Sequence, residues 1–239
     1  MIIQSKKQSL QTILSNKKVF ILSAIYAITI VLLRIFPFAF SIDLSISIKF
    51  VGVCLTDFFT FPMLLGLTYC LLKNRVDIRS FLHFYYGRRL LTVIPLTLIT
   101  LFINNIIEYL KTISNSNYYN IIIIAVGAFC IVVLNYLFVF EYYFAMYDSD
   151  VNNVFRKSFY IFKKHFIKII LFNLSFILWY IVPAIIIFIY EYVNAITDYQ
   201  AWWIMLFLSQ AVNVFYQPYY IKSKINFISF LENNENKIL

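Results

Sequence analysis

The residues most able to do chemistry in this sequence are charged side chains that interrupt long apolar segments. Asp57 lies inside the apolar segment 49–72, and Arg34 lies inside the preceding one, 19–40. A charge at the centre of a helix in lipid costs about 2.5–3.5 kcal/mol, so such residues are paired or functional. Two antiparallel helices that rise ~1.5 Å per residue place both side chains at a similar depth. The pattern predicts an Asp57–Arg34 ion pair that locks a helical hairpin, or alternatively a carboxylate that couples protons or ions.

Glu141 is a third charge of this kind, about two turns before the end of the apolar segment 121–147. A long side chain at that position can extend its charged end toward the polar interface. We expect a nearby base to neutralise it, with Lys164 and Lys168 as the plausible partners.

Amide side chains form a further candidate group on the last apolar segment. Gln210, Asn213 and Gln217 are spaced i, i+3 and i+7, so they share one helix face. Asn173 of the preceding apolar segment is expected at a depth close to that of Asn213. Amides in lipid commonly join helices through hydrogen bonds of ~0.6–2 kcal/mol. The alternative is a water-lined path that these amides form together with Asp57.

Motifs for catalysis or cofactor binding are missing from the sequence. No G-x-x-x-x-G-K-[ST] or G-x-G-x-x-G run is present to hold a nucleotide phosphate. His83 and His165 have no carboxylate at metal-ligand spacing, and Cys54, Cys70 and Cys130 form no C-x-x-C pair. We therefore expect no catalytic residue, no cofactor and no metal site, and we predict a non-enzymatic protein.

Membrane helices are expected to carry these residues. Of the 239 residues 62% are hydrophobic and only 13% are charged, which leaves too few polar side chains to cover a water-soluble fold. A helix needs about 20 apolar residues to cross a bilayer, and six segments qualify. The prediction is an all-α fold, a polytopic membrane bundle of six transmembrane helices. These helices are expected at 19–40, 49–72, 90–110, 121–147, 166–190 and 202–220.

The distribution of positive charge predicts the orientation of the bundle. All but three of the 20 lysines and arginines fall on one side of the expected spans, and the exceptions are Arg34, Lys49 and Lys111. Basic residues concentrate on the cytoplasmic side of membrane proteins, so we expect both termini to be cytoplasmic. The same rule accounts for the net charge of +9 without nucleic acid, which is not an expected partner.

The segments that join the spans on the inner side are predicted to be interfacial helices at 77–87 and 150–166. In the second segment apolar side chains recur at helical spacing, and Asp150 or Ser149 can cap the helix. Basic side chains on the inner face are expected to bind anionic phospholipid at ~1 kcal/mol each. The apolar series is Val151, Phe155, Phe159, Phe162 and Phe166, and the expected headgroup ligands are Arg88, Arg89, Arg156, Lys157, Lys163 and Lys164.

The chain is expected to form a single membrane domain, 1–239. Units 1–72, 73–147 and 148–220 each contain an inner-face helix, a basic pair and two spans, and a polar cytoplasmic tail follows at 221–239. An internal triplication is one interpretation of these units. The other is that any six-span protein with this topology shows such a period.

The stretch from Phe140 to Trp179 carries a resemblance to a known family. It contains an apolar span that ends in Asp, an F-R-K-S turn, a K-K-H-F step and the sequence L-S-F-I-L-W, and F-P-M-L-L-G-L at 61–67 and Q-P-Y-Y at 217–220 are similar as well. Over roughly 50–235 the chain resembles a bacterial family of uncharacterised multi-pass integral membrane proteins, a domain of unknown function. That family is related to the membrane domain of glycerophosphodiester phosphodiesterases. The resemblance implies a multi-pass fold and a bacterial membrane location, and it implies no activity.

These observations predict an accessory or scaffold protein of a bacterial inner membrane, held to anionic phospholipid by its inner-face helices. The alternative is a transporter or permease subunit that moves a peptide, lipid or small solute, with Asp57 and the amides of 202–220 along its path. Because no ATP site is present, such a subunit would depend on an ATPase partner or an ion gradient. The expected partners are therefore anionic phospholipids and, for the alternative, other membrane proteins or an ATPase subunit.

Overall fold

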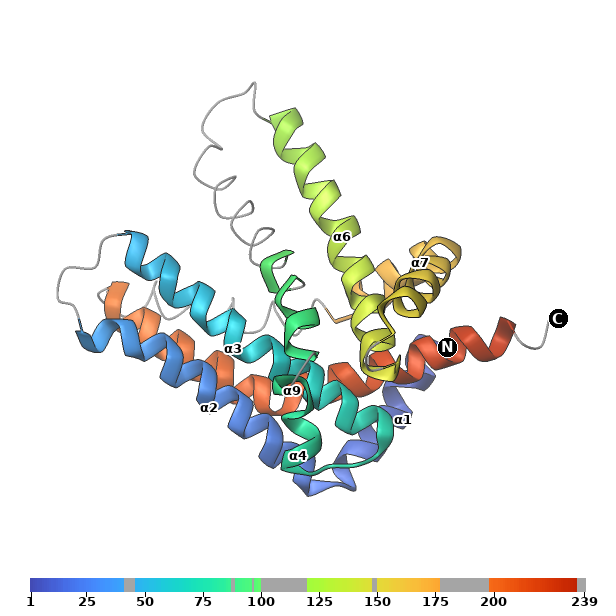
Figure 1. Ribbon diagram of the computed structural model, residues 1–239, viewed down its shortest axis with the longest axis horizontal. Helices are drawn as coiled ribbons and strands as arrows, with labels where there is room; N and C mark the ends of the chain where they lie inside the picture. Colours follow the sequence, from blue (N-terminus) through green and yellow to red (C-terminus); the bar gives the residue numbers. More distant parts are fainter. Residues whose placement is uncertain are drawn as a thin grey trace.

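The computed structural model describes residues 1–40, 46–86, 89–95, 97–99, 120–147, 150–176 and 198–235. Every regular element in these ranges is a helix, which confirms the predicted all-α fold (Figure 1). Short helical stretches also occur at 89–95 and 97–99. The main elements are α1 (Ile2–Leu14), α2 (Lys17–Phe40), α3 (Ile46–Lys73), α4 (Ile78–Phe81), the 3₁₀ turn η1 (His83–Tyr85), α6 (Asn120–Tyr147), α7 (Val151–Leu174) and α9 (Asp198–Glu235).

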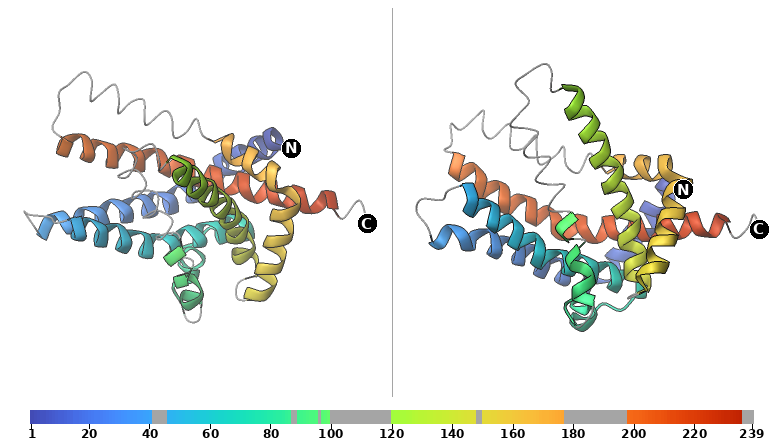
Figure 2. Two further views of the ribbon diagram at one scale, coloured as in Figure 1. Left: turned by 90° about the horizontal axis from the view of Figure 1, so that it is seen from above. Right: turned by 45° about the horizontal axis from the view of Figure 1, so that its top comes forward.

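The helices form two arms that meet at a common base. Helices α2 and α3 lie side by side and antiparallel, and the first half of α9 packs along α2 (Figures 1 and 2). Helix α6 rises away from this group as the second arm, with α7 packed against its C-terminal half. Helix α1, α7 and the second half of α9 gather at the base, where both ends of the described chain lie.

Three of the six predicted spans coincide with helices of the structure. Helices α2, α3 and α6 cover the predicted segments 19–40, 49–72 and 121–147 and begin one to three residues earlier. Much of the predicted spans 90–110 and 166–190 lies outside the described residues. Within the described ranges no single helix is both long and apolar enough to cross a bilayer, and α1 with Lys17–Leu33 of α2 reaches that length and apolarity only as a pair bent by 93°. Six membrane crossings therefore remain a prediction.

Helix α9 is longer than the sixth predicted span and corrects the view of 221–239 as a polar tail. It continues from the expected end at Tyr220 to Glu235, while 236–239 lies outside the described residues. Ile221, Ile225 and Ile228 are buried at the base of the two arms. Their spacing of i, i+4 and i+7 gives the continued helix a core-facing side, although lysines and asparagines lie between them.

The corner between α3 and α4 depends on two residues with special backbone requirements. Asn74 follows the last residue of α3 in the left-handed conformation, with φ of 53°, and the Arg75 N–H donates to the Cys70 carbonyl at 3.0 Å. This is the usual way to satisfy the last carbonyls of a helix. Gly66 permits the close return of α4, because a Cβ atom there would lie 1.8 Å from the Phe81 carbonyl oxygen.

Helix α7 begins at the predicted cap and then departs from the predicted pattern. The Asp150 side chain accepts the Asn153 N–H at 3.2 Å, which confirms the cap. The expected apolar series is not the buried face: Phe155 and Phe159 are exposed, whereas Val154, Ser158 and Ile161 are buried. Two rings of the series still contact α6, since Phe155 lies 4.9 Å from Phe140 and Phe162 lies 5.5 Å from Tyr136, between ring centroids.

A bend divides α7 into two parts. His165 has non-helical angles, φ of −121° and ψ of 22°, inside the K-K-H-F step of the sequence. This region of backbone space is sparsely populated and marks a change in direction. The residues before the bend coincide with the segment predicted to be an interfacial helix, and those after it coincide with the start of the segment predicted to be the fifth span.

The base of the two arms is packed with aromatic rings. Phe172 of α7 stacks on Phe227 of α9 with ring centroids 4.4 Å apart, and Phe84 of η1 contacts Phe144 of α6 at 5.5 Å. Aromatic pairs at such distances add about 0.5–1.5 kcal/mol to the burial of their area. This packing holds α6, α7 and α9 in fixed positions around the polar residues described next.

Candidate functional site

The most buried charge of the described chain is paired inside the base. Lys224 of α9 donates to the Glu141 carboxylate of α6 at 2.5 Å, and their side chains are 2% and 17% exposed. The Lys224 ammonium also lies 5.2 Å from the centre of the Phe138 ring. The expected partners of Glu141, Lys164 and Lys168, are both wrong, because α9 continues as a helix and brings Lys224 to the carboxylate first.

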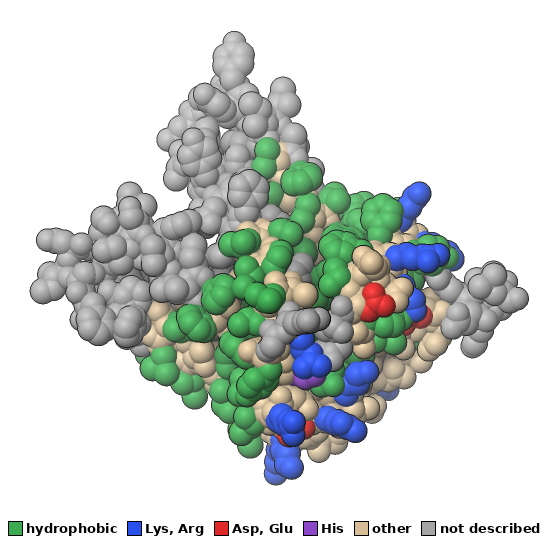
Figure 3. All heavy atoms as spheres, in the orientation of Figure 1, with side chains coloured by type: hydrophobic (Ala, Val, Ile, Leu, Met, Phe, Trp, Pro, Cys, Tyr) green, Lys and Arg blue, Asp and Glu red, His purple; other side chains and the backbone are tan. Residues whose placement is uncertain are grey.

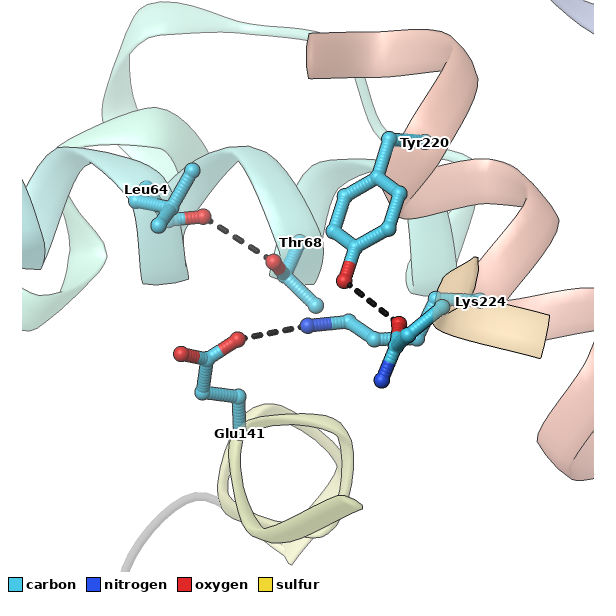
Figure 4. A network of polar contacts seen from close by, with 6 residues as sticks. Leu64, Thr68, Glu141, Tyr220 and Lys224 are labelled. Carbon is cyan, nitrogen blue, oxygen red and sulfur yellow. Dashed lines mark hydrogen bonds and ion pairs between the residues drawn. The ribbon is translucent and has the colours of Figure 1, made fainter. Parts of the chain in front are cut away.

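Two further polar side chains, Thr68 and Tyr220, lie beside this pair (Figure 4). Lys224 extends between Glu141 and Thr68 of α3, whose hydroxyl donates to the Leu64 carbonyl of its own helix at 3.0 Å. Tyr220 lies one turn before Lys224 on α9 and points toward the same region. An ion pair in such a weakly polar interior contributes little net stability, but removal of one partner costs about 3–5 kcal/mol.

A chain of hydrogen bonds extends from Tyr220 to α7 and α6. The Tyr220 hydroxyl donates to Asn173 Oδ1 at 3.0 Å, and Asn173 Nδ2 donates to Asn135 Oδ1 at 2.7 Å. The sequence predicted that Asn173 joins helices, but it did not identify these partners. We call Asn135, Glu141, Asn173, Tyr220 and Lys224 the junction cluster.

The amides of the first half of α9 follow the predicted face and bond mostly within their own helix. Asn213 Nδ2 donates to Gln210 Oε1 at 3.2 Å, and the Ser23 hydroxyl of α2 donates to the Asn213 backbone carbonyl at 3.3 Å. Gln210 is buried and Gln217 is half-buried. Tyr220 and Lys224 continue the same face at i+10 and i+14 from Gln210, so a polar seam leads along α9 to the junction cluster.

The predicted Asp57–Arg34 pair lies in α3 and α2, which do pack side by side as expected. Both side chains lie outside the described residues. The pairing remains a prediction.

The expected lipid-binding residues of α7 are all on its surface. Arg156, Lys157, Lys163 and Lys164 are exposed, and the Lys164 ammonium lies 3.3 Å from the Tyr160 hydroxyl. Arg89 is half-buried and Arg88 lies outside the described residues. In Figure 3 basic side chains follow the lower and right edges of the described surface, and hydrophobic side chains cover its middle.

Two lysines on the expected inner side turn inward instead and bind helix ends. Lys6 of α1 donates to the Ser175 carbonyl at the end of α7, at 2.7 Å, and Lys222 of α9 donates to the Leu71 carbonyl at the end of α3, at 3.1 Å. Cations are favoured at C-terminal helix ends because the exposed carbonyls are partly negative. Burial lowers the pKa of both Lys6 and Lys222 below the ordinary value. Sequence reading missed this role, since it depends on contacts between residues far apart in the chain.

A second carboxylate joins α6 to the end of α9. The hydroxyls of Tyr143 and Tyr142 donate to the two oxygens of Glu232, at 2.7 and 3.4 Å. Among the described residues no group of three or more His, Cys, Asp or Glu side chains could hold a metal ion. The polar groups of the base thus connect helices to one another.

No family model, curated protein or solved structure matches this chain.

Proposed function

We propose that this protein is an integral protein of a bacterial inner membrane that acts as an accessory or scaffold component, not as an enzyme. It crosses the membrane six times with both termini in the cytoplasm. It binds anionic phospholipid through the basic helices of its inner face.

The observation that carries the proposal is the outer face of α2. Ile21, Ile25, Ile28 and Leu32 are exposed at i, i+4, i+7 and i+11, which forms one unbroken apolar stripe along the helix. Exposed apolar area costs about 25 cal/mol per Å² in water and nothing in a lipid environment. Exposed Phe129 of α6 and other large side chains extend this property to the second arm.

The contact with anionic lipid is supported by the charges on α7. Its exposed basic residues Arg156, Lys157, Lys163 and Lys164 stand beside the exposed rings of Phe159 and Tyr160. Rings of this kind favour the interface between headgroups and acyl chains, and each base adds about 1 kcal/mol near an anionic surface.

The scaffold role is supported by the way the interior polar groups are satisfied. Glu141 is bound by Lys224, and Asn173 is bound by Asn135 and Tyr220, so these side chains join α6, α7 and α9. A static junction of this kind suits a protein that holds a fixed shape.

The test of lipid binding compares two sets of four substitutions. One variant changes Arg156, Lys157, Lys163 and Lys164 to Gln, and the control exchanges Arg and Lys at the same positions so that the charge is kept. After purification in detergent, the amount of phosphatidylglycerol that remains bound is measured by mass spectrometry. We expect a several-fold loss in the first variant and no loss in the control. Equal retention in both would contradict the proposed lipid contact.

The transporter alternative has one supporting observation, the polar seam that leads along α9 to the ion pair of Glu141 and Lys224. It predicts solute or proton flux in proteoliposomes that Asp57→Asn abolishes, or an ATPase that purifies with the protein. The scaffold proposal predicts neither flux nor an associated ATPase.

A further inference from the structure

Helix α1 has one side that is firmly held by the rest of the protein. Ser5, Ser9 and Ile13 are buried at i, i+4 and i+8, and Asn226 of α9 donates to the Ser9 hydroxyl at 2.9 Å. Lys6 adds its bond to the end of α7 and lies 3.9 Å from the centre of the Phe176 ring. The small serines allow α1 and α9 to approach closely, so α1 is part of the base and not a loose terminus.

A different side of α1 is apolar and exposed. Ile3, Leu10 and Leu14 are 83%, 48% and 64% exposed, and their spacing of i, i+7 and i+11 aligns them in one stripe. Lys7 lies within this stripe at i+4. The exposed glutamines, Gln4, Gln8 and Gln11, lie on another face. The separation of the exposed apolar residues from the exposed glutamines indicates that the apolar face contacts something other than water.

The orientation of α1 relative to α2 indicates what covers the stripe. The two helices are bent by 93° with respect to each other. If α2 crosses the membrane as proposed, α1 lies parallel to the membrane surface. The chain from Met1 to Lys18 has the exposed bases Lys7, Lys17 and Lys18 and no acidic residue, so its charge complements an anionic surface.

We infer that α1 is a lipid-binding helix that inserts Ile3, Leu10 and Leu14 into the boundary between headgroups and acyl chains of the anionic cytoplasmic leaflet. Lys7 lies at the level of the phosphates. An amphipathic helix in this position typically buries its apolar face to ~5–10 Å. Because its serine side is bound to α9, α1 forms a fixed support on the membrane and does not fold upon contact. This inference rests on the proposed function and assigns lipid contacts to residues distinct from those of α7.

The experiment measures the depth of single positions in the full-length protein. Cys54, Cys70 and Cys130 are changed to Ala, and one cysteine is introduced by Leu10→Cys, Gln8→Cys or Ile25→Cys and labelled with a fluorophore. The proteins are reconstituted in vesicles of phosphatidylcholine and phosphatidylglycerol whose acyl chains carry bromine. We expect strong quenching at positions 10 and 25 and several-fold weaker quenching at position 8, which lies on the glutamine face of α1.

The outcomes separate this inference from the proposed function. Strong quenching at position 25 with equally weak quenching at positions 10 and 8 would overturn the inference and leave the membrane proposal intact. The same result is expected if another protein covers α1. Absence of quenching at all three positions would overturn both.

A second measurement uses the unaltered chain with a photoactivatable phosphatidylglycerol. We expect adducts at Ile3, Leu10 and Leu14, and adducts confined to other helices would contradict the inference.

Discussion

At the scale of single residues, the ion pair between Glu141 and Lys224 has the clearest energetic consequence. Both side chains are largely removed from solvent and each is the other's counter-charge, at 2.5 Å. A neutral residue in place of one leaves an uncompensated charge among aromatic rings. The pair is therefore sensitive to single substitutions and tolerant of a matched double substitution.

We predict that Lys224→Met lowers the free energy of unfolding by about 3–5 kcal/mol. The double variant Glu141→Gln with Lys224→Met should recover a large part of this loss, because no buried charge remains. Lys163→Met, on the exposed face of α7, serves as the control and should change stability by less than about 0.5 kcal/mol. Thermal unfolding in detergent provides the measurement. A double variant as unstable as the sum of its singles would show that the two residues do not interact.

A second prediction at the scale of residues concerns Gly66 of α3 and Gly127 of α6. Gly66→Ala places a methyl group 1.8 Å from a backbone oxygen of Phe81, so α4 must move and we expect a loss of about 1–3 kcal/mol. Gly127→Ala is the matched control, since no neighbouring atom of the described residues lies within 4 Å of the place its Cβ would take, and alanine favours a helix. Equal thermal stability of the two variants would contradict the close approach of α4 to α3.

At the scale of elements, the short helix α4 depends on its cap. The Asp77 carboxylate accepts the Ser80 N–H at 2.8 Å and the Ser80 hydroxyl at 2.9 Å. These bonds hold the pKa of Asp77 below its ordinary value, so they favour the ionised form in the folded state. Their contribution is complete above the ordinary carboxyl pKa and is lost as the pH falls through the lowered pKa.

We therefore predict that Asp77→Ala weakens α4 at neutral pH and that this difference from the unaltered protein disappears in acid. Hydrogen exchange of the α4 amides, compared at pH 6 and after exposure to pH 2–3, measures the effect. The control Asp77→Asn keeps a capping side chain without the charge, so its difference from Asp77→Ala should not change with pH. A difference between Asp77→Ala and the unaltered protein that stays constant across this pH range would mean that the carboxylate charge does not contribute.

The second half of α9 is the element on which the base depends most. Lys222, Lys224 and Phe227 bind α3, α6 and α7 respectively. A chain that ends after Tyr220 should fail to fold, whereas a chain that ends after Glu235 should keep its thermal stability. Size-exclusion chromatography in detergent distinguishes the two. Normal folding of the shorter chain would show that 221–235 is the dispensable tail expected from its composition.

Sequence predicted the helices with continuous apolarity and failed where apolar residues alternate with polar ones. The bounds of α2, α3 and α6 followed from length and hydrophobicity, and the cap of α7 followed from Asp150. The second half of α9 was missed because its apolar residues are separated by lysines and asparagines. The partner of Glu141 was missed as a consequence. Lys224 is 83 positions away in sequence, and only the continuation of α9 as a helix brings it near.

At the scale of the whole molecule, the net charge of +9 has two uses. Exposed bases such as Arg156 and Lys163 lie on the surface of α7, and we propose that they orient the bundle and contact anionic lipid. Inside the base, Lys6 and Lys222 bind the carbonyls of helix ends, and Lys224 forms the ion pair with Glu141. On this proposal the positive charge both orients the bundle and holds its helices together.

The central claim is a membrane protein with six crossings and both termini in the cytoplasm, and its most direct test is the sidedness of two positions. Asn152 lies at the start of α7, and Asn194 lies in the predicted connection between the fifth and sixth spans, outside the described residues. Alkaline phosphatase, which is active only after export, is fused at each position. We predict activity at Asn194 and none at Asn152. Activity at Asn152 instead, or equal activity at both positions, would contradict it.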